Sequence, residues 1–238
     1  MTKKLKEKLV KKENEIRVLL KVVQAVSSLN LEKVLKEIVK IATKITRADS
    51  CLVYVLDPKK NELVLRASKN PHPKLLRRIK LRLGEGITGW VAKEKKAVAL
   101  SSEAYNDPRF KFFQSLPEDR YQSFLSVPII YKNETVGVIN VQHRKRHTYP
   151  KEEIALLLAI GKLVGGAVEN ARLVEESLAL KDALQTRKVL EKAKGILMKN
   201  LKISEDEAYR RIQKQSMNSR WSIREICEAI ILSEKLSS

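Results

Sequence analysis

The final fifty residues of the chain contain two helix-start signatures, and these constrain its fold more than any other feature. Each is a serine followed three residues later by a glutamate, Ser204 with Glu207 and Ser222 with Glu225. In such a capping box, the hydroxyl and the carboxylate satisfy backbone amides that are left unpaired at a helix start. We therefore expect three helices within residues 186–238, separated near residues 202 and 221.

Each of these expected helices carries a narrow apolar stripe, and three such stripes can close one small core. The stripes consist of Leu190, Ala193, Ile196 and Leu197 in the first helix, Ala208, Ile212 and Met217 in the second, and Ile223, Ile226, Cys227, Ile230 and Ile231 in the third. The segment therefore predicts a compact three-helix domain.

The remaining faces of these helices are basic. In the first helix, Lys188, Lys192 and Lys199 share one line at steps of four and seven residues. Beside that line lie Arg187 and Lys194, and the second helix adds Arg210, Arg211 and Lys214. Cations on rigid helices suit a phosphate backbone, but charge alone fits a solvated surface equally well.

A resemblance to a known family favours the first of these two interpretations. Its carriers, in order and spacing, are Arg187, the run Ala193-Lys194-Gly195-Ile196-Leu197-Met198, then Ala208-Tyr209, Ser216-Met217 and Arg220. This pattern resembles the ANTAR domain, a three-helix RNA-binding module of bacterial transcription antiterminators, although Ile212 replaces the usual leucine and Ser216 the usual alanine. The resemblance implies binding to paired hairpin loops of a nascent transcript, which prevents a terminator hairpin from forming.

Gly195 and Tyr209 each allow a structural and a functional interpretation. Glycine inside a helix costs about 1 kcal/mol relative to alanine, so either another helix packs closely at Gly195 or RNA approaches there. We favour RNA, because Gly195 shares the line of Lys188. Tyr209 can stack on a base, but we expect it to cap the core. The candidate RNA-binding residues are Arg187, Lys188, Lys192, Lys194, Gly195, Lys199, Tyr209, Arg210, Arg211, Lys214 and Arg220.

Composition places the chain among globular proteins, since 43% of its 238 residues are apolar. Its net charge of +20 is spread along the chain and identifies no site. Cys51 and Cys227 lie among apolar neighbours, so we expect buried free thiols and no metal site. No apolar run approaches the roughly 18 residues of a membrane span, and no signal peptide is evident. We expect a cytoplasmic protein without a membrane partner.

The first part of the chain mixes helices with paired strands. Residues 1–29 keep a 3.5-residue apolar period from Leu5 to Val26, which predicts an N-terminal coiled-coil helix. A helix from Leu31 follows, and another opens after Pro150. The expected strands are 51–56, 62–67, 97–100, 123–131 and 135–143. Turn residues join the first two of these strands, and the last two form an antiparallel hairpin.

Residues 30–172 resemble a GAF domain, a cytoplasmic small-molecule sensor. The carriers are Gly84-x-Gly86-x-x-Gly89-Trp90-Val91-Ala92, Asn106-Asp107-Pro108-Arg109-Phe110, Ser126-Val127-Pro128-Ile129 and Val136-Gly137-Val138-Ile139-Asn140-Val141. The three glycines also fit a dinucleotide-binding loop, which we reject because the flanking strands form hairpins and no βαβ unit follows.

The GAF resemblance implies a pocket for a small-molecule effector whose identity is unknown. By position in that fold, we expect Phe110, Phe113 and Phe124 to form its wall. No cysteine stands where a linear tetrapyrrole would be attached. His143 precedes the basic run 144–146, so we interpret it as part of a solvated loop rather than a haem ligand. No cofactor is evident.

A second coiled-coil pattern follows the sensor. Seven apolar residues at heptad spacing run from Leu157 to Leu178, so we expect two chains to pack along this helix as a homodimer: Leu157, Ile160, Val164, Ala167, Ala171, Val174 and Leu178. The register breaks at Lys181 and Gln185, inside the linker 173–185 that precedes the RNA-binding segment.

Together these features predict an α+β protein. An N-terminal GAF domain, with an antiparallel sheet flanked by helices, is joined by a long coiled-coil helix to an all-α three-helix ANTAR domain at 186–238. We expect a signal-responsive antitermination regulator and not an enzyme, because no catalytic set is legible. The alternatives are a DNA-binding regulator with a C-terminal helical domain and a ligand-binding dimeric scaffold whose coiled coil joins partners. A GAF unit that binds no ligand would instead serve as a dimerisation spacer.

Overall fold

The computed structural model describes residues 30–70, 74–113, 116 and 120–237, together with six separate residues between 12 and 22. The chain forms two compact units, Met1–Val174 and Glu175–Ser238. Most of the predicted coiled-coil helix at 1–29 lies outside the described residues, so that prediction stays a prediction.

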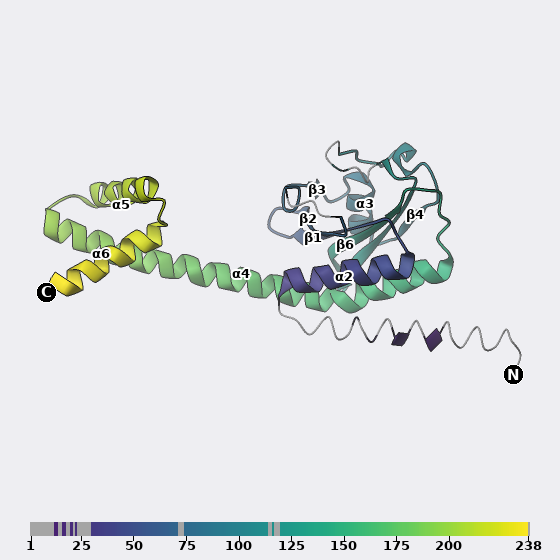
Figure 1. The fold of residues 1–238 in the computed structure, drawn as a ribbon, viewed down its shortest axis with the longest axis horizontal. Helices are drawn as coiled ribbons and strands as arrows, with labels where there is room; N and C mark the ends of the chain where they lie inside the picture. Colours follow the sequence, from purple (N-terminus) through teal and green to yellow (C-terminus); the bar gives the residue numbers. More distant parts are fainter. Residues whose placement is uncertain are drawn as a thin grey trace, which may run out of the picture. The chain divides into compact units, whose positions relative to one another are not determined.

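The first unit is built on one curled antiparallel sheet (Figure 1). Within the described residues its strand order is β3-β2-β1-β6-β5-β4, and every pair of neighbours is antiparallel. The strands are β1 (Ser50–Asp57), β2 (Glu62–Ser68), β3 (Lys80–Arg82), β4 (Val98–Leu100), β5 (Ser123–Tyr131) and β6 (Glu134–His143). The predicted hairpins are confirmed, and a doubly wound dinucleotide fold is excluded.

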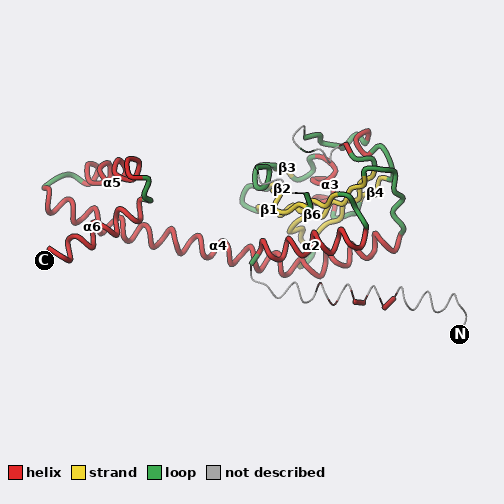
Figure 2. The backbone as a smooth tube through the Cα atoms, in the orientation of Figure 1, coloured by secondary structure: helices red, strands yellow, loops and turns green. Residues whose placement is uncertain are grey.

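Helices cover both faces of this sheet (Figure 2). Alternation along β1 shows how the two cores are built, because successive side chains point to opposite faces. Cys51 and Val53 join the core beneath two long helices, whereas Leu52 and Tyr54 join the core on the other face. The helical elements of this unit are α2 (Leu31–Thr46), α3 (Gly86–Glu94), η1 (Ala104–Asn106) and the first part of α4 (Lys151–Leu201).

The apolar stripe of α4 packs inside its own unit. Leu157, Ile160 and Val164 are at most 1% exposed, and Ala167 and Ala171 are buried in the same core, against the sheet and α2. The prediction that this part of the stripe joins two chains is therefore wrong. A helix lying on a sheet needs apolar residues every three or four positions, as a coiled coil does. Beyond this stretch, Leu178 is 60% exposed.

Helix α4 also contains an 18-residue window apolar enough to cross a membrane. This differs from the expectation that no apolar run in the sequence approaches the length of a membrane span. Nearly half of that window, 44%, is buried within the protein. A core helix of a soluble protein passes the same test of length and composition, so one such helix is weak evidence for a membrane span.

His143 ends β6 and is buried, with only 8% of its surface exposed. Its Nε2 lies 3.0 Å from the carbonyl oxygen of Thr46, the last residue of α2. The interpretation of His143 as part of a solvated loop is therefore wrong. The basic run that follows it is exposed, but β6 is a central strand that is buried continuously from Thr135 to its last residue, His143.

The second unit contains the three predicted helices: the end of α4, then α5 (Glu205–Ser219) and α6 (Ile223–Ser237). Both predicted breaks are confirmed. At α6 the capping box is reciprocal, since the amide of Glu225 donates to Ser222 Oγ at 3.2 Å and the amide of Ser222 donates to Glu225 Oε2 at 2.7 Å. At α5 the hydroxyl of Ser204 accepts from the amide of Glu207 at 3.3 Å.

The core of the second unit forms around Ala193, Ile212, Ile226 and Cys227. Met217, a predicted core residue, is 76% exposed, so that prediction is wrong. It follows Ile212 by five residues, which places it about 140° around the helix from the core side. Both cysteines are buried free thiols, as predicted, and burial raises the pKa of the Cys51 thiol to about 12.

Two glycines allow α4 to lie directly on β5. A Cβ at Gly165 would meet the backbone carbonyl oxygen of Ile130, and one at Gly161 would meet that of Pro128. Backbone cannot give way as a flexible side chain can, so a side chain here would push the helix off the sheet. The next residue, Gly166, is different, because its nearest neighbour is the Tyr131 ring at 3.4 Å.

This contrast predicts opposite outcomes for two adjacent substitutions. Gly165→Ala should destabilise the first unit by about 1–3 kcal/mol through overpacking, although alanine favours a helix by about 1 kcal/mol. Gly166→Ala should be neutral or stabilising. Urea unfolding followed by Trp90 fluorescence, in a Trp221→Phe background, measures both. Equal urea midpoints for the two variants would contradict the close contact.

Candidate RNA-binding surface and effector cavity

One ridge of α4 in the second unit is basic and exposed. It consists of Lys188, Lys192, Gly195 and Lys199, all of them exposed, at steps of four, three and four residues. We call these four residues the basic ridge. The core residues of this helix, such as Ala193, lie on its opposite side. The ridge is therefore open to a partner, with Arg187 exposed beside it.

Gly195 lies in the middle of the basic ridge and is exposed. A Cβ built on it would meet nothing within 4 Å among the described residues. Close packing of another helix among the described residues therefore does not explain why this position is a glycine. A bare helix surface between Lys192 and Lys199 leaves room for a partner to come close to the main chain.

Lys194 is placed differently from the basic ridge. Only 8% of its surface is exposed, and its Nζ lies 2.8 Å from Glu191 Oε1 and 2.6 Å from Glu205 Oε1. Hydrogen bonds to Glu191 and Glu205 raise the pKa of Lys194, and its ammonium lowers the pKa of Glu205. This lysine joins α4 to the first residue of α5, so its charge is compensated within the unit.

Helix α5 presents further candidate residues to solvent. Arg210 and Lys214 are exposed, and Arg211 donates to Glu207 at 3.1 Å one turn earlier. Tyr209 is 40% exposed, so the expectation that it caps the core is wrong. It lies about 100° around the helix from buried Ala208. Its ring is accessible to a stacking partner.

The junction of α5 and α6 carries residues with special geometry. Arg220 ends α5 in the left-handed conformation, with φ of 61°, and its side chain is exposed. Next to it, Trp221 is 54% exposed, and sequence reasoning missed it, although an aromatic residue beside a cation is a recognisable signal. A groove of about 420 Å³ is lined by Leu197, Arg211, Ile212, Gln215, Ser219, Trp221, Ile226, Ala229 and Ile230.

The three phenylalanines predicted for the effector site line one cavity in the first unit. The rings of Phe110 and Phe124 meet edge to face with centroids 6.3 Å apart, and Phe113 lies in the same lining. Polar side chains also line it, among them Thr88, Asn140, Gln142 and Lys111. Asn140 Nδ2 donates to Thr88 Oγ1 at 2.8 Å.

This cavity is nearly filled, since its volume is about 20 Å³. That is room for about one water molecule. The structure thus brings the predicted aromatic residues together over polar groups, but a larger ligand requires its lining side chains to move.

Comparison with known proteins agrees with this geometry. The sequence model of the GAF domain matches residues 28–169, more than half of the chain. The chain belongs to the GAF family. The sequence model of the ANTAR domain matches residues 178–231. The antiparallel sheet with its helices is thus the GAF domain, and the helical second unit contains the ANTAR domain.

The GAF domain is similar to one part of a longer bacterial protein. The Escherichia coli protein named phosphoenolpyruvate-dependent phosphotransferase system is 28% identical over 123 residues, which are 52% of this chain and 16% of that protein. The chain thus matches only about a sixth of its curated relative's length.

Solved structures give the same result. The GAF domain of the Acinetobacter phosphoenolpyruvate-protein phosphotransferase is 27% identical, with a TM-score of 0.60 over 68% of this chain and 97% of that one. The corresponding domain from Coxiella burnetii is 28% identical, with a TM-score of 0.63 over 69% and 98%. GAF and ANTAR domains are regulatory and typically soluble, so the chain is a GAF–ANTAR regulator.

The different environments of two nearby lysines predict different effects on stability. Lys194→Ala should lower the melting temperature of the ANTAR domain, because it removes the bridge between Glu191 and Glu205 and leaves two carboxylates side by side. Lys192→Ala, on the exposed basic ridge, should leave the melting temperature almost unchanged. Trp221 fluorescence during heating, in a Trp90→Phe background, measures both. The bridge has no structural role if the two variants melt together.

Proposed function

We propose that this chain is a signal-responsive, cytoplasmic regulator of transcription antitermination. In this proposal the ANTAR domain binds paired hairpin loops of nascent RNA under the control of the GAF domain, and the chain regulates without catalysing a reaction. The observation that carries the proposal is the exposed basic ridge with a bare glycine at its centre. RNA-binding antitermination is the known role of ANTAR domains.

The chemistry of the ridge suits an RNA loop. Lys188, Lys192 and Lys199 can each contact a phosphate, and Gly195 lets the sugar-phosphate backbone or a base come close to the helix. Exposed Tyr209 on α5 offers a ring on which an unstacked base can lie. We assign Lys194 a supporting role, because its ammonium is compensated by two carboxylates.

Binding of the full chain to three nucleic acids of equal length tests the proposal. The ligands are a transcript with two hairpin loops, a transcript with one, and duplex DNA, each titrated over a range of salt. The two-loop transcript should bind most tightly. Tighter binding of the duplex would support a DNA-binding regulator instead, and no binding of any ligand would support a dimeric scaffold.

The basic ridge predicts a specific change in salt dependence. Lys188→Ala, Lys192→Ala and Lys199→Ala should each weaken RNA binding and flatten the slope of log affinity against log salt by about 0.7 to 0.9, one phosphate contact each. Lys60→Ala is the control, since Lys60 is exposed in the turn between β1 and β2 of the GAF domain. If all three variants have the same salt slope as the control, the basic ridge does not contact RNA phosphates.

Gly195 provides a sharper test, because one substitution should move stability and binding in opposite directions. Gly195→Ala adds a methyl group in open space, so it should stabilise the helix by about 1 kcal/mol. The same methyl group should weaken RNA binding if the nucleic acid needs the bare helix surface. A variant that is more stable and binds RNA like the wild type would show that Gly195 has no part in recognition.

We also propose that the regulator is a homodimer through α4. Within its second unit, this helix leaves Leu178, Leu180 and Leu184 between 56% and 60% exposed. Leu180 and Leu184 are four residues apart on one face, so a second copy of the same helix can cover them, whereas Leu178 lies on the other side of the helix. The helix continues through Lys181 and Gln185, where a break of register is predicted. Dimerisation would present two ANTAR domains to two RNA loops and raise affinity on the order of a hundredfold.

If the dimer forms through α4, a charge introduced at these leucines should dissociate it, whereas a charge at an exposed leucine elsewhere should not. Leu180→Glu with Leu184→Glu should convert the dimer to a monomer, because carboxylates would be buried against each other. The control is Leu232→Glu, since Leu232 is 58% exposed on α6. Light scattering at micromolar protein measures the mass. A wild-type monomer, or an unchanged dimer in the double variant, would contradict this interface.

The signal in this proposal is a small molecule bound by the GAF domain, whose identity is open. Its site would be the cavity of Phe110, Phe113 and Phe124, opened by movement of its lining. A ligand that binds the folded state raises the melting temperature by mass action. If no cellular extract shifts the melting of the GAF domain, the domain serves as a dimerisation spacer.

A further inference from the structure

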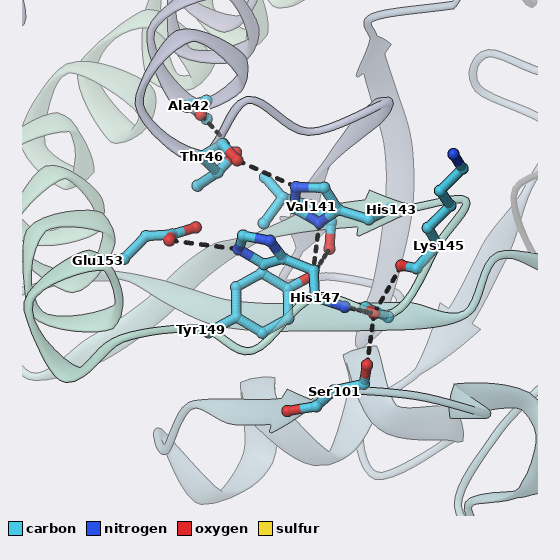
Figure 3. Close-up of polar contacts among 10 residues, drawn as sticks. Ala42, Thr46, Ser101, Val141, His143, Lys145, His147, Tyr149 and Glu153 are labelled. Carbon is cyan, nitrogen blue, oxygen red and sulfur yellow. Dashed lines mark hydrogen bonds and ion pairs between the residues drawn. The ribbon is translucent and has the colours of Figure 1, made fainter.

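A buried cluster of titratable side chains joins the end of α2 to the start of α4 (Figure 3). His143 ends β6, His147 and Tyr149 lie in the loop that follows, and Glu153 lies in the first turn of α4. The two imidazole rings stack, with centroids 4.0 Å apart and an angle of 16° between their planes. Neither the effector cavity nor the RNA surface includes these residues.

The hydrogen bonds of His143 define the role of one ring nitrogen and leave the other able to take a proton. Its Nε2 lies 3.0 Å from the carbonyl oxygen of Thr46, which can only accept, so Nε2 carries a hydrogen. Its Nδ1 lies 3.1 Å from the hydroxyl of Tyr149, which donates to Nδ1 when the ring is neutral and accepts from it when the ring is protonated. Nδ1 is therefore where a further proton binds. Burial is the main reason that the pKa of His143 lies below its usual value.

A proton on Nδ1 can be accommodated by the neighbouring hydroxyl. Nδ1 would then donate to Tyr149, and the hydroxyl hydrogen could turn toward the carbonyl oxygen of Val141 at 3.4 Å. The hydrogen-bond pattern therefore survives with its direction reversed. The surroundings disfavour a positive charge on His143. His147 and Lys69 oppose this charge, whereas Asp49 favours it.

His147 connects the cluster to α4. Its Nε2 lies 3.4 Å from Glu153 Oε2, and the side chain of Glu153 is only 14% exposed. Burial raises the pKa of Glu153, and His147 lowers it in part. The ring of His147 therefore lies between the carboxylate of Glu153 and the ring of His143. Two protonated rings at 4.0 Å would repel each other in this low-dielectric site.

We propose that the GAF domain senses protons directly and that the stacked pair of His143 and His147 is the receptor site. Protonation of His143 strengthens its bond to Thr46, because a cation is favoured at the C-terminus of a helix. The same proton separates the two rings and releases the loop that leads into α4. The signal therefore loosens the start of α4 while α2 keeps its contact.

The direction of the pH response follows from linkage. The unfolded state binds a proton at His143 near its ordinary pKa of 6.5, and the folded state binds it only at lower pH. The stacked form is therefore fully stable above about pH 6.5 and loses stability as pH falls. Glu153 acts in the opposite direction, because its raised pKa favours the folded state when it is protonated.

The test uses the full chain with His72→Gln, which leaves the two imidazoles of the receptor site as the only ones in the sequence. Nuclear magnetic resonance should show the imidazole of His143 titrating below its ordinary pKa. Hydrogen exchange should show a local change, because the amides of Glu153 and Ile154 donate to the carbonyl oxygen of Pro150 at the start of α4. Their protection should fall severalfold from pH 7.5 to 5.5.

Two variants serve as matched controls. His143→Gln keeps an amide donor for Thr46 and has no titrating ring, so the loss of protection should disappear. His147→Gln removes the neighbouring ring whose coulombic effect lowers the pKa of His143, so it should raise that pKa and also abolish the loss of protection. The proposal is overturned by equal loss of protection in the parent and both variants, by His143 titrating at its ordinary value, or by equal loss of protection in the central strands. RNA is absent from this measurement, so failure of RNA binding does not affect it.

Discussion

The packing of α4 determines the architecture of this chain. Gly161 and Gly165 bring the helix against backbone carbonyl groups of β5, and this contact buries Leu157 in the GAF core. The same helix later contributes Ala193 to the core of the second unit. Because protein interiors are close-packed, α4 cannot slide within either core without losing side-chain contacts in that core. A rearrangement at the start of α4 therefore directly affects the packing of this helix.

The sequence predicted the elements well where the signal is local. The two capping boxes gave the starts of α5 and α6, because a serine and a glutamate three residues apart satisfy specific amides. The turn residues between strand-like segments allowed the antiparallel hairpins to be predicted. Phe110, Phe113 and Phe124 came together as the family resemblance implied, although the size of their cavity depends on side-chain packing that no sequence pattern records.

Prediction from the sequence was wrong where one residue pattern is compatible with two structures. The apolar stripe from Leu157 is compatible with a helix in a coiled coil and with a helix packed on a sheet. Gly161 and Gly165 distinguish the two, because residues without a side chain next to the stripe allow close contact with the backbone of a sheet. Likewise, Lys192 and Lys194 are both basic, but positions two apart lie about 200° apart on a helix. One is on the exposed ridge, and the other forms a bridge with Glu205. Charge patterning alone does not separate such roles.

Single-round transcription can show whether the chain acts as an antiterminator that binds RNA through the basic ridge. The template encodes two hairpin loops, the second overlapping a terminator, and the measured quantity is the fraction of transcripts that pass the terminator. The full chain should raise this fraction, and a folded variant with alanine at Lys188, Lys192 and Lys199 should not. An unchanged fraction with the wild-type chain, or an equal rise with the triple variant, would contradict this role.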